Sequence, residues 1–256
     1  MSQIVLTDAK IWVGGYNISG YSNEATITQT PAMLEATVFG NSTKVNKAGL
    51  YDFKADVGGF MDFVYPMGAA GSTDQLNSMN SALFSKVGGA VDVLSMAPLG
   101  NAEEDLVYFL QNVMSKFDPM GGAVGALMPY KAEFTAAGTR LVRGSLKGRG
   151  AKTATGNSAA PTQFVGGVPS GSKLFAALHV FGSSGTTPTL DVVVRSAALV
   201  DMASPTTRIT FPQFTTSVGA SWQSVAGAIT DEFFDVEWTI TGTTPSFNLA
   251  VVIGLI

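Results

Sequence analysis

Apolar and polar residues alternate along several segments, most clearly near the C-terminal end. In residues 234–241 the apolar members are Phe234, Val236, Trp238 and Ile240. A period of two places successive side chains on opposite faces of a β-strand. We therefore predict a strand with one buried face at residues 234–241.

The same period predicts strands elsewhere in the chain. Its apolar rows are Ala25 and Ile27; Tyr51, Phe53, Ala55 and Val57; Tyr130, Ala132 and Phe134; and Phe247, Leu249, Val251 and Ile253. The apolar run 106–110 fits either a buried strand or a helix that begins near Asn101, with the acidic residues 103–105 in its first turn. We favour the strand.

One segment has the spacing of a helix. Its apolar stripe is Leu76, Met79, Leu83, Phe84 and Val87, which fall on one side of a helix. Ser72, Thr73 or Asp74 can cap its start, and Gly88 stands where a C-terminal cap belongs. We predict a single helix here.

A stretch of small and polar residues without periodicity separates two strand-rich parts. It runs from Gly150 to Pro161 and predicts a linker or long loop. We therefore divide the chain into a first domain at 1–150, a linker at 151–170, and a C-terminal antiparallel β-sandwich at 171–256.

The C-terminal part contains two similar motifs. Residues 185–190 read Gly-Thr-Thr-Pro-Thr-Leu, and residues 242–247 read Gly-Thr-Thr-Pro-Ser-Phe. Glycine allows positive φ, and proline fixes φ. Both motifs predict hairpin turns that launch a strand, and they fit either an internal duplication or two independent turns.

The composition favours a protein whose surface is partly covered by neighbours. Hydrophobic residues make up 46% of the chain and charged residues 13%, compared with roughly 25% charged residues in average chains. So few charges protect a free surface poorly against association. We favour an assembled protein over the alternative, a secreted β protein of low charge.

Charge and residue usage exclude several classes of function. The net charge of −4 argues against a general nucleic-acid binder, which is typically basic. With no cysteine and one histidine, disulfides, thiolate metal sites and multi-histidine sites are excluded. No signal segment is visible, and the apolar run 249–256 is far shorter than the roughly 20 residues of a membrane span. We expect a soluble protein made in a reducing cell, with no cofactor, metal or membrane partner.

Candidate catalytic residues are few. His179 lies in the apolar run 174–181, and a structural role is favoured over a catalytic one. The acidic groups at 103–105 and 231–232 leave a two-carboxylate glycosidase as a minor alternative, because adjacent acids usually form a solvated turn. Hydrolase, zinc-protease and phosphate-loop motifs are absent from the sequence, and we predict no enzyme.

One cluster of basic residues stands out. It consists of Arg140, Arg143, Lys147, Arg149 and Lys152, and no acidic residue interrupts it. In an extended strand Arg143, Lys147 and Arg149 share one face. The cluster fits a solvated strand end, or an electrostatic contact with an acidic patch on a neighbouring subunit or with DNA.

The order of short motifs in the first 150 residues resembles that of phage tail-tube (major tail) proteins. The matching segments are 15–20 (a Gly-Tyr-Asn-Ile-Ser-Gly turn), 23–29, 34–40, 48–50, 58–62 and 141–144. Ala48 departs from the proline of many relatives. The C-terminal part lies outside the minimal tube fold and looks like an added surface sandwich.

The resemblance implies a fold and a function. The fold is mainly β, with an N-terminal tube-like sandwich or barrel flanked by one helix. The function is that of a virion subunit, assembled in the host cytoplasm, whose rings of six copies stack around a DNA channel. Its partners are further copies of itself, other virion proteins and, by passive contact, DNA.

The resemblance also implies an assembly loop that reaches the next ring. It extends from Phe39 to Leu50, and its members are Phe39, Gly40, Lys44, Lys47, Gly49 and Leu50. We expect this loop to be mobile before assembly, and the strand at 51–57 to help form the sheet between subunits.

Two alternatives remain from other classes. A capsid decoration protein would bind a preformed shell and need not polymerise alone. A glycan-binding β-sandwich would present exposed aromatic rings from Trp12, Trp222 or Trp238, although Trp238 belongs to a predicted buried row.

Overall fold

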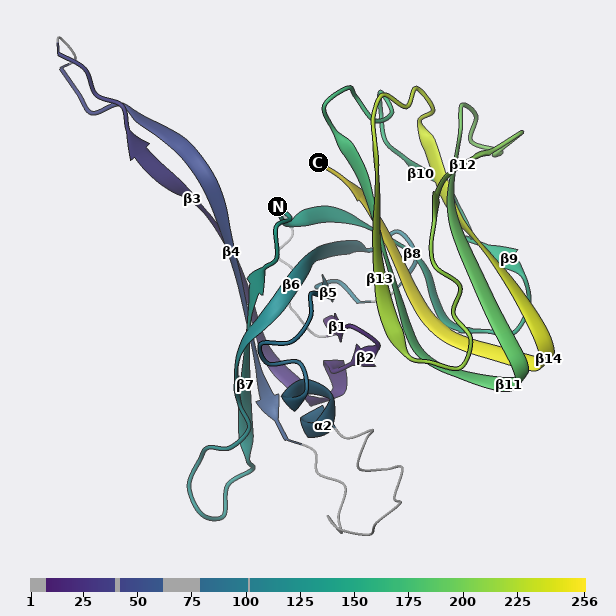
Figure 1. Cartoon of the computed structure of the whole chain (residues 1–256), viewed down its shortest axis with the longest axis horizontal. Helices are drawn as coiled ribbons and strands as arrows, with labels where there is room; N and C mark the ends of the chain where they lie inside the picture. The colour runs from purple at the N-terminus through teal and green to yellow at the C-terminus, as the bar shows by residue number, and fades with distance from the viewer. Residues whose placement is uncertain (1–7, 40–41, 62–78, 101) are drawn as a thin grey trace. The chain divides into compact units, whose positions relative to one another are not determined.

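A computed structural model describes residues 8–39, 42–61, 79–100 and 102–256 of the chain. The predicted mainly β class is confirmed, since the named strands all pair antiparallel and the described residues contain one α-helix (Figure 1). The chain forms two compact units. Unit 1 comprises residues 1–20, 92–111 and 142–256, and unit 2 comprises residues 21–91 and 112–141.

The elements are shared between the units as follows. Unit 1 contains β1 (Lys10–Val13), β2 (Tyr16–Asn17), β5 (Asp92–Ala97), the first half of β6 (Leu106–Asp118), β8 (Val142–Lys152), β9 (Gly156–Asn157), β10 (Thr162–Gln163), β11 (Lys173–Ala197), β12 (Thr206–Thr210), β13 (Gly219–Ala226) and β14 (Phe233–Leu255). Unit 2 contains β3 (Ser22–Glu35), β4 (Asn46–Phe60), α2 (Met79–Phe84), the second half of β6 and β7 (Pro129–Ala136). A short 3-10 turn, η1 (Ser19–Tyr21), spans the point in the sequence where unit 1 ends and unit 2 begins.

The strands β11 and β14 form the framework of unit 1. They pair antiparallel from Leu174 with Leu255 to Ala197 with Phe233. The ladder shifts register near its middle, and the paired ribbon bends there (Figure 1). Strands that bend in this way pass from one layer of a sandwich to the other.

The repeated Gly-Thr-Thr-Pro motif makes this corner. Gly185 and Gly242 have φ of 110° and 119°, and Thr187 and Thr244 have φ of 46° and 48°. The two motifs face each other so closely that a Cβ on Gly185 would lie 2.8 Å from the Thr244 carbonyl oxygen. The prediction of two hairpin turns is therefore wrong, because pairing between β11 and β14 uses the same backbone geometry to bend two continuous strands.

The bent ribbon encloses the first core of unit 1. Inward side chains come from both halves of β11 and β14, and they include Leu174, Leu178, Val192, Val194, Phe234, Val236, Trp238, Phe247, Leu249, Val251 and Ile253. Each large side chain buried in this way contributes about 1.5–3 kcal/mol. The apolar rows predicted at 234–240 and 247–253 are confirmed as buried rows.

A second core lies on the opposite side of the ribbon. It gathers side chains from β1, β5, β6, β8, β11 and β14, namely Trp12, Val93, Ala97, Val107, Phe109, Val142, Leu146, Ala177, Ala250 and Val252. Residues 106–110 therefore belong to a strand, as favoured from the sequence. The ribbon has apolar side chains on both faces, which explains why parts of β11 and β14 are almost continuously apolar.

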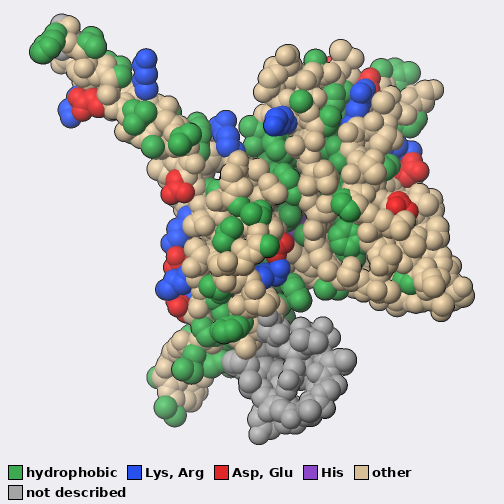
Figure 2. Space-filling model, in the orientation of Figure 1, with side chains coloured by type: hydrophobic (Ala, Val, Ile, Leu, Met, Phe, Trp, Pro, Cys, Tyr) green, Lys and Arg blue, Asp and Glu red, His purple; other side chains and the backbone are tan. Residues whose placement is uncertain are grey.

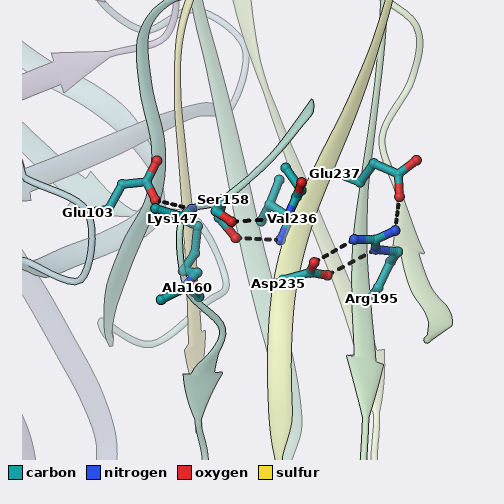
Figure 3. Close-up of polar contacts among 10 residues, drawn as sticks. Glu103, Lys147, Ser158, Ala160, Arg195, Asp235, Val236 and Glu237 are labelled. Atoms are coloured by element: carbon teal, nitrogen blue, oxygen red, sulfur yellow. Dashed lines mark hydrogen bonds and ion pairs between the residues drawn. The ribbon is translucent and has the colours of Figure 1, made fainter. Parts of the chain in front are cut away.

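The region predicted as a linker is part of unit 1. β9 pairs with β14 at Gly156 and Trp238, and β10 pairs with β14 at Thr162 and Phe234. Ser158 also exchanges hydrogen bonds with the backbone of β14 (Figure 3). The units differ from the division at 150 and 170, because β8 and β14 are distant in sequence but are neighbours in one sheet.

A buried ion pair crosses the β11–β14 ladder. Asp235 is 1% exposed and accepts two hydrogen bonds from the Arg195 guanidinium, from Nε at 3.0 Å and from Nη2 at 2.5 Å. Arg195 also contacts Glu237 from the same strand (Figure 3). This two-pronged pairing satisfies a carboxylate that burial would otherwise destabilise.

Unit 2 is a sheet in the order β3–β4–β7–β6. The rows predicted at 51–57 and 130–134 form its buried face, with Phe53, Ala55, Val57, Tyr130, Ala132 and Phe134 at 2% exposure or less. Tyr51 is the exception, because it lies beyond the end of β7 and is 43% exposed. The third predicted row lies in β3 but is not buried, because Ala25 is exposed and Ile27 is only half-buried.

The single predicted helix is present in part. α2 begins at Met79, while Leu76 and the capping residues 72–74 lie outside the described residues. Leu83 is buried, whereas Phe84 and Val87 are exposed. Gly88 lies beyond the helix, where its N–H donates to the Met114 carbonyl of β6 at 2.9 Å. No helix in the described part of the chain combines the length and apolar character of a membrane span.

Candidate assembly surface

The β3–β4 hairpin of unit 2 continues beyond the rest of its sheet. β7 stops accompanying β4 at Lys54, whereas β3 and β4 remain paired as far as Glu35 and Asn46. We call this extension, residues 29–39 and 42–53, the arm (Figure 1). Beyond Phe53, which is buried at its base, the arm consists of two strands without a covering layer.

The arm exposes many large apolar side chains. They are Met33, Leu34, Val38, Phe39, Val45, Leu50 and Tyr51, and hydrophobic atoms gather visibly at its end (Figure 2). Leu50 is 87% exposed. Isolated exposed apolar residues are ordinary, but a concentration of them marks an interaction surface. Covering a largely exposed side chain such as Leu50 or Phe39 would contribute about 1.5–3 kcal/mol before the costs of association, and the partly exposed ones would contribute less.

The two strands of the arm stay hydrogen-bonded up to the residues that flank its tip, Ala36 and Val45. The Ala36 N–H donates to the Val45 carbonyl at 2.7 Å, and the Val45 N–H donates to Thr37 Oγ1 at 3.0 Å. Lys44 and Glu35 form an exposed ion pair at 3.2 Å, so the charges next to the tip are balanced.

The predicted assembly-loop residues lie at different places on the arm. Phe39 and Lys44 lie in the connecting loop, and Gly40 lies outside the described residues. Lys47, Gly49 and Leu50 belong to β4. There Gly49 and Leu50 stand opposite Ala32 alone, because the register shifts between Pro31 and Met33. The resemblance placed these residues in one long loop, whereas cross-strand pairing shortens it.

The outer edge of β3 is open. Among the described residues β3 pairs with β4 alone, and its sequence contains no Lys or Arg. Exposed edges are commonly protected by lysine, proline or bulges, and in β3 Pro31 and the register shift beside it protect one point. The stretch at residues 25–30 has neither a charge nor a proline and can accept a further strand. The strand at 51–57 was expected to join subunits, but from Lys54 onward it is paired on both sides.

The outward face of the same sheet carries paired charges. Lys54 lies 3.1 Å from Asp56 and 3.2 Å from Glu133, and Lys116 lies 2.6 Å from Asp118. Hydrogen bonding to Asp56 raises the pKa of Lys54, and hydrogen bonding to Asp118 raises the pKa of Lys116. Exposed pairs of this kind contribute little stability.

A shallow depression of about 260 Å³ lies on this charged face. It is lined by Glu24, Thr26, Asp56, Val57, Gly58, Lys131, Ala132 and Glu133. Acidic side chains outnumber basic ones in this lining, so the depression is not suited to binding phosphate groups tightly. The face can remain wetted beside a polyanion without binding it strongly.

The predicted basic cluster does not form one patch. Arg140 belongs to unit 2, and its guanidinium lies 4.2 Å from the centre of the Tyr51 ring. Lys152 lies 4.4 Å from the Trp238 ring in unit 1. A register shift between Val251 and Val252 interrupts the alternation of β8. Because of this shift, Arg143 and Arg149 lie on opposite faces of the strand, and the predicted shared face is wrong.

Lys147 is the extra residue at that bulge and points into unit 1. Its side chain is fully buried. The Lys147 Nζ donates to the Ala160 carbonyl at 2.5 Å (Figure 3) and pairs with Glu104. This lysine therefore joins β8 to neighbouring segments and is unavailable to DNA or to another subunit.

The acidic residues considered for catalysis hold structural bonds. Glu104 also accepts from Thr162 Oγ1 at 2.7 Å. Hydrogen bonds from Ser196 and Arg208 lower the pKa of Asp231, and bonds from Gln163 and the Gly166 N–H lower that of Glu232. A catalytic acid at neutral pH needs a raised pKa, so these groups do not suit that role.

The aromatic residues do not form a glycan platform. Trp12 and Trp238 are 1% and 4% exposed. Trp222 is half-buried and packs against Phe109 and Phe175, with ring centres at 5.3 and 5.4 Å. The three indoles belong to cores, as predicted for Trp238.

A further exposed apolar segment was missed in the sequence. The β6–β7 loop, residues 119–128, exposes Met120, Val124 and Leu127. The signal was present, because residues 119–130 contain no charged side chain.

Comparison with known proteins gives structural likenesses alone. No protein-family model matches the chain, and no curated protein sequence matches it. A chain from the tail of an empty GTA particle, refined with C6 symmetry, is 12% identical, with TM-score 0.35, and the match covers 47% of this chain and 80% of that one. The SPP1 Dit hub protein is 10% identical, with TM-score 0.37, and the match covers 98% of this chain and 100% of that one.

A chain of the PVC sheath–tube complex, from an extracellular contractile injection system, is 11% identical, with TM-score 0.38 and coverage of 56% and 92%. These neighbours come from tail, hub and injection assemblies. Identities and TM-scores of this size do not establish a common fold, so the chain's own surfaces must carry the functional interpretation.

Proposed function

We propose that this chain is a non-catalytic structural subunit of a phage-type tail, and specifically a tail-tube subunit that forms stacked rings around a DNA channel in the virion. The observation that carries the proposal is the arm, an ordered hairpin with large apolar side chains and no covering layer. A monomer gains nothing from such a surface, whereas a polymer buries it.

Rings would form through the edges of the unit 2 sheet. Within the part of the chain that the structure describes, β3 is open at one side, and at the other side Lys116, Phe117 and Asp118 of β6 pair with β7 alone. Joining the first edge of one copy to the second edge of the next is a heterologous contact, which closes into a ring when the rotation allows. The motif resemblance supports six copies per ring.

The remaining surfaces fit this assignment. The charged face of the sheet would meet water or DNA without binding DNA tightly. Unit 1 has two apolar cores of its own, which suits an added domain on a tube. The exposed Arg143 and Arg149 remain candidates for passive contact with DNA or with other virion proteins.

A replacement of the arm tip tests the proposal. Residues 37–44 are exchanged for Asn-Gly, so that Ala36 and Val45 can close a two-residue turn. We expect the variant to keep its circular-dichroism spectrum and to lose tubes or stacked rings in negative-stain electron microscopy, because Val38 and Phe39 are removed. A matched control is Leu199→Ser with Val200→Ser, which removes exposed apolar side chains from unit 1.

The outcomes separate the candidate functions. Tubes from the wild type and the control, but not from the tip variant, support a tube subunit. Normal tubes from the tip variant contradict the role of the arm. Discrete particles from the wild type at every concentration, together with binding to preformed phage shells, would favour capsid decoration instead.

A further inference from the structure

The β6–β7 loop is a second apolar projection of unit 2. Its exposed side chains are Met120, Val124 and Leu127, and Val124 has no contact that removes it from solvent. The loop is shaped by its own backbone. Gly122 and Gly125 have φ of 89° and 90°, and the Ala126 N–H donates to the Ala123 carbonyl at 3.1 Å.

This loop and the arm tip lie at opposite ends of the same strand. Asn46 at the start of β4 pairs with Glu35, next to the arm tip. Phe60 at its end pairs with Pro129, next to the β6–β7 loop. The 15 residues of β4 span about 50 Å at the rise of a strand. Figures 1 and 2 show the two projections apart, each with hydrophobic side chains.

The two surfaces are chemically compatible. The β6–β7 loop has no charged side chain, and the charges beside the arm tip, Glu35 and Lys44, are paired with each other. A contact through Val38 and Phe39 would bury apolar atoms on both sides. The Glu35–Lys44 pair is balanced, and the exposed Lys47 can stay at the rim of the contact, where water solvates its charge.

We propose that the arm of one copy docks on the β6–β7 loop of the next copy. This inference rests on the proposed function and names the partner surface of the arm. Because the surfaces differ and lie at opposite ends of one sheet, the contact is head-to-tail and leaves a free arm and a free loop at the ends. It therefore repeats without limit. A contact between two arms would instead stop at a pair.

Disulfide trapping tests the contact directly, because the chain contains no cysteine. The double variant Phe39→Cys with Val124→Cys is oxidised at assembly concentration and examined on non-reducing gels. The expected result is a ladder of covalent multimers that disappears on reduction. The matched control is Phe39→Cys with Thr153→Cys, which places the second thiol at an exposed site in unit 1 and should give no ladder beyond dimers.

A mixing experiment gives an independent readout. Phe39→Asp places a charge on the arm, and Val124→Asp places one on the β6–β7 loop. Each change should prevent that surface from docking, so neither variant should stack by itself. In an equal mixture the arm of the loop variant can meet the loop of the arm variant. Junctions should then reappear in stacks limited to two layers, seen by electron microscopy and sedimentation.

The outcomes distinguish this inference from the proposed function. Tubes from the wild type without a covalent ladder, or normal tubes from Val124→Asp, overturn the arm–loop contact and leave the tube subunit standing. A wild type that forms neither tubes nor a ladder overturns both. A mixture that behaves like the separate variants also contradicts the contact.

Discussion

At the residue scale, His179 joins distant parts of unit 1. Its side chain is fully buried in β11. The Nδ1–H donates to the Gly14 carbonyl at 2.6 Å, which leaves Nε2 to accept from Ser95 Oγ at 2.8 Å. Trp12 and Phe181 flank the ring at 5.9 and 6.1 Å. The histidine and serine are both closed to solvent, so their bond fixes β1, β5 and β11 to one another and does not prepare a nucleophile.

Asp231 gives a prediction about acid stability. The hydrogen bond from Ser196, followed by that from Arg208, lowers the pKa of this carboxyl. The resulting stability is fully present above the ordinary pKa of an aspartate and is lost as pH falls through the depressed value. We expect Asp231→Asn to lower the urea midpoint at pH 7, and the difference from wild type to shrink below pH 4.

Urea titrations at both pH values measure this effect. Asp52→Asn, at an exposed position of β4, is the matched control and should change the midpoint little at either pH. A gap between Asp231→Asn and wild type that is equally wide at pH 7 and pH 3 would rule out the proposed linkage.

At the element scale, the corner of the β11–β14 ribbon depends on glycine. Gly242 has a φ of 119°, and a Cβ there would lie 2.9 Å from the carbonyl oxygens of Thr186 and Thr187. Gly242→Ala should lower the unfolding free energy by about 1–3 kcal/mol, the usual cost of a strained backbone position. Thermal unfolding followed by circular dichroism measures the loss.

Gly182→Ala is the control for this substitution. Gly182 lies in the same strand pair, has ordinary φ, and has open space where its Cβ would stand. It should change stability by less than about 1 kcal/mol. Equal losses in the two variants would show that the corner geometry is not responsible.

The elements also show what sequence periodicity can reveal. The rows at 51–57, 130–134 and 234–240 were found, except for the exposed Tyr51, because each strand buries one face, which imposes a period of two. The corner motifs were mistaken for hairpin turns, because glycine and proline permit both geometries. The partner that decides between them lies far along the chain. The inward direction of Lys147 was also missed, because it depends on a bulge opposite β14 and the alternation of residues in β8 does not reveal a bulge.

At the scale of the whole molecule, the two units are interleaved along the chain. β6 begins in unit 1 and ends in unit 2, and the chain returns to unit 1 at β8. A domain boundary drawn from composition could not detect this order, because pairing between β8 and β14 joins distant residues. The motif resemblance predicted an assembly loop at residues 39–50, whereas the extent of the arm depends on cross-strand pairing between β3 and β4.

Assembly should respond to salts as an apolar contact does. The exposed side chains of the arm and of the β6–β7 loop are uncharged except for the Glu35–Lys44 pair, Lys47 and Asp52. Raising NaCl from 50 to 300 mM should change the assembly midpoint by less than about threefold, because screening acts on charges. Ammonium sulfate should promote assembly by strengthening apolar burial. Light scattering at matched protein concentrations measures both effects, and a strong loss in NaCl would point to ion pairs instead.

The β11–β14 ladder also constrains how unit 1 folds. Ala197 and Phe233 are its partners closest in sequence, whereas Leu174 and Leu255 are its most distant partners. Closing the shorter loop, between Ala197 and Phe233, costs less chain entropy than closing the longer one, between Leu174 and Leu255. Pairing should therefore nucleate near Ala197 and extend through the glycine corner toward Leu174. The corner thus determines the register of the remaining ladder, since a one-residue slip there would exchange the buried and exposed faces of all pairs between the corner and Leu174.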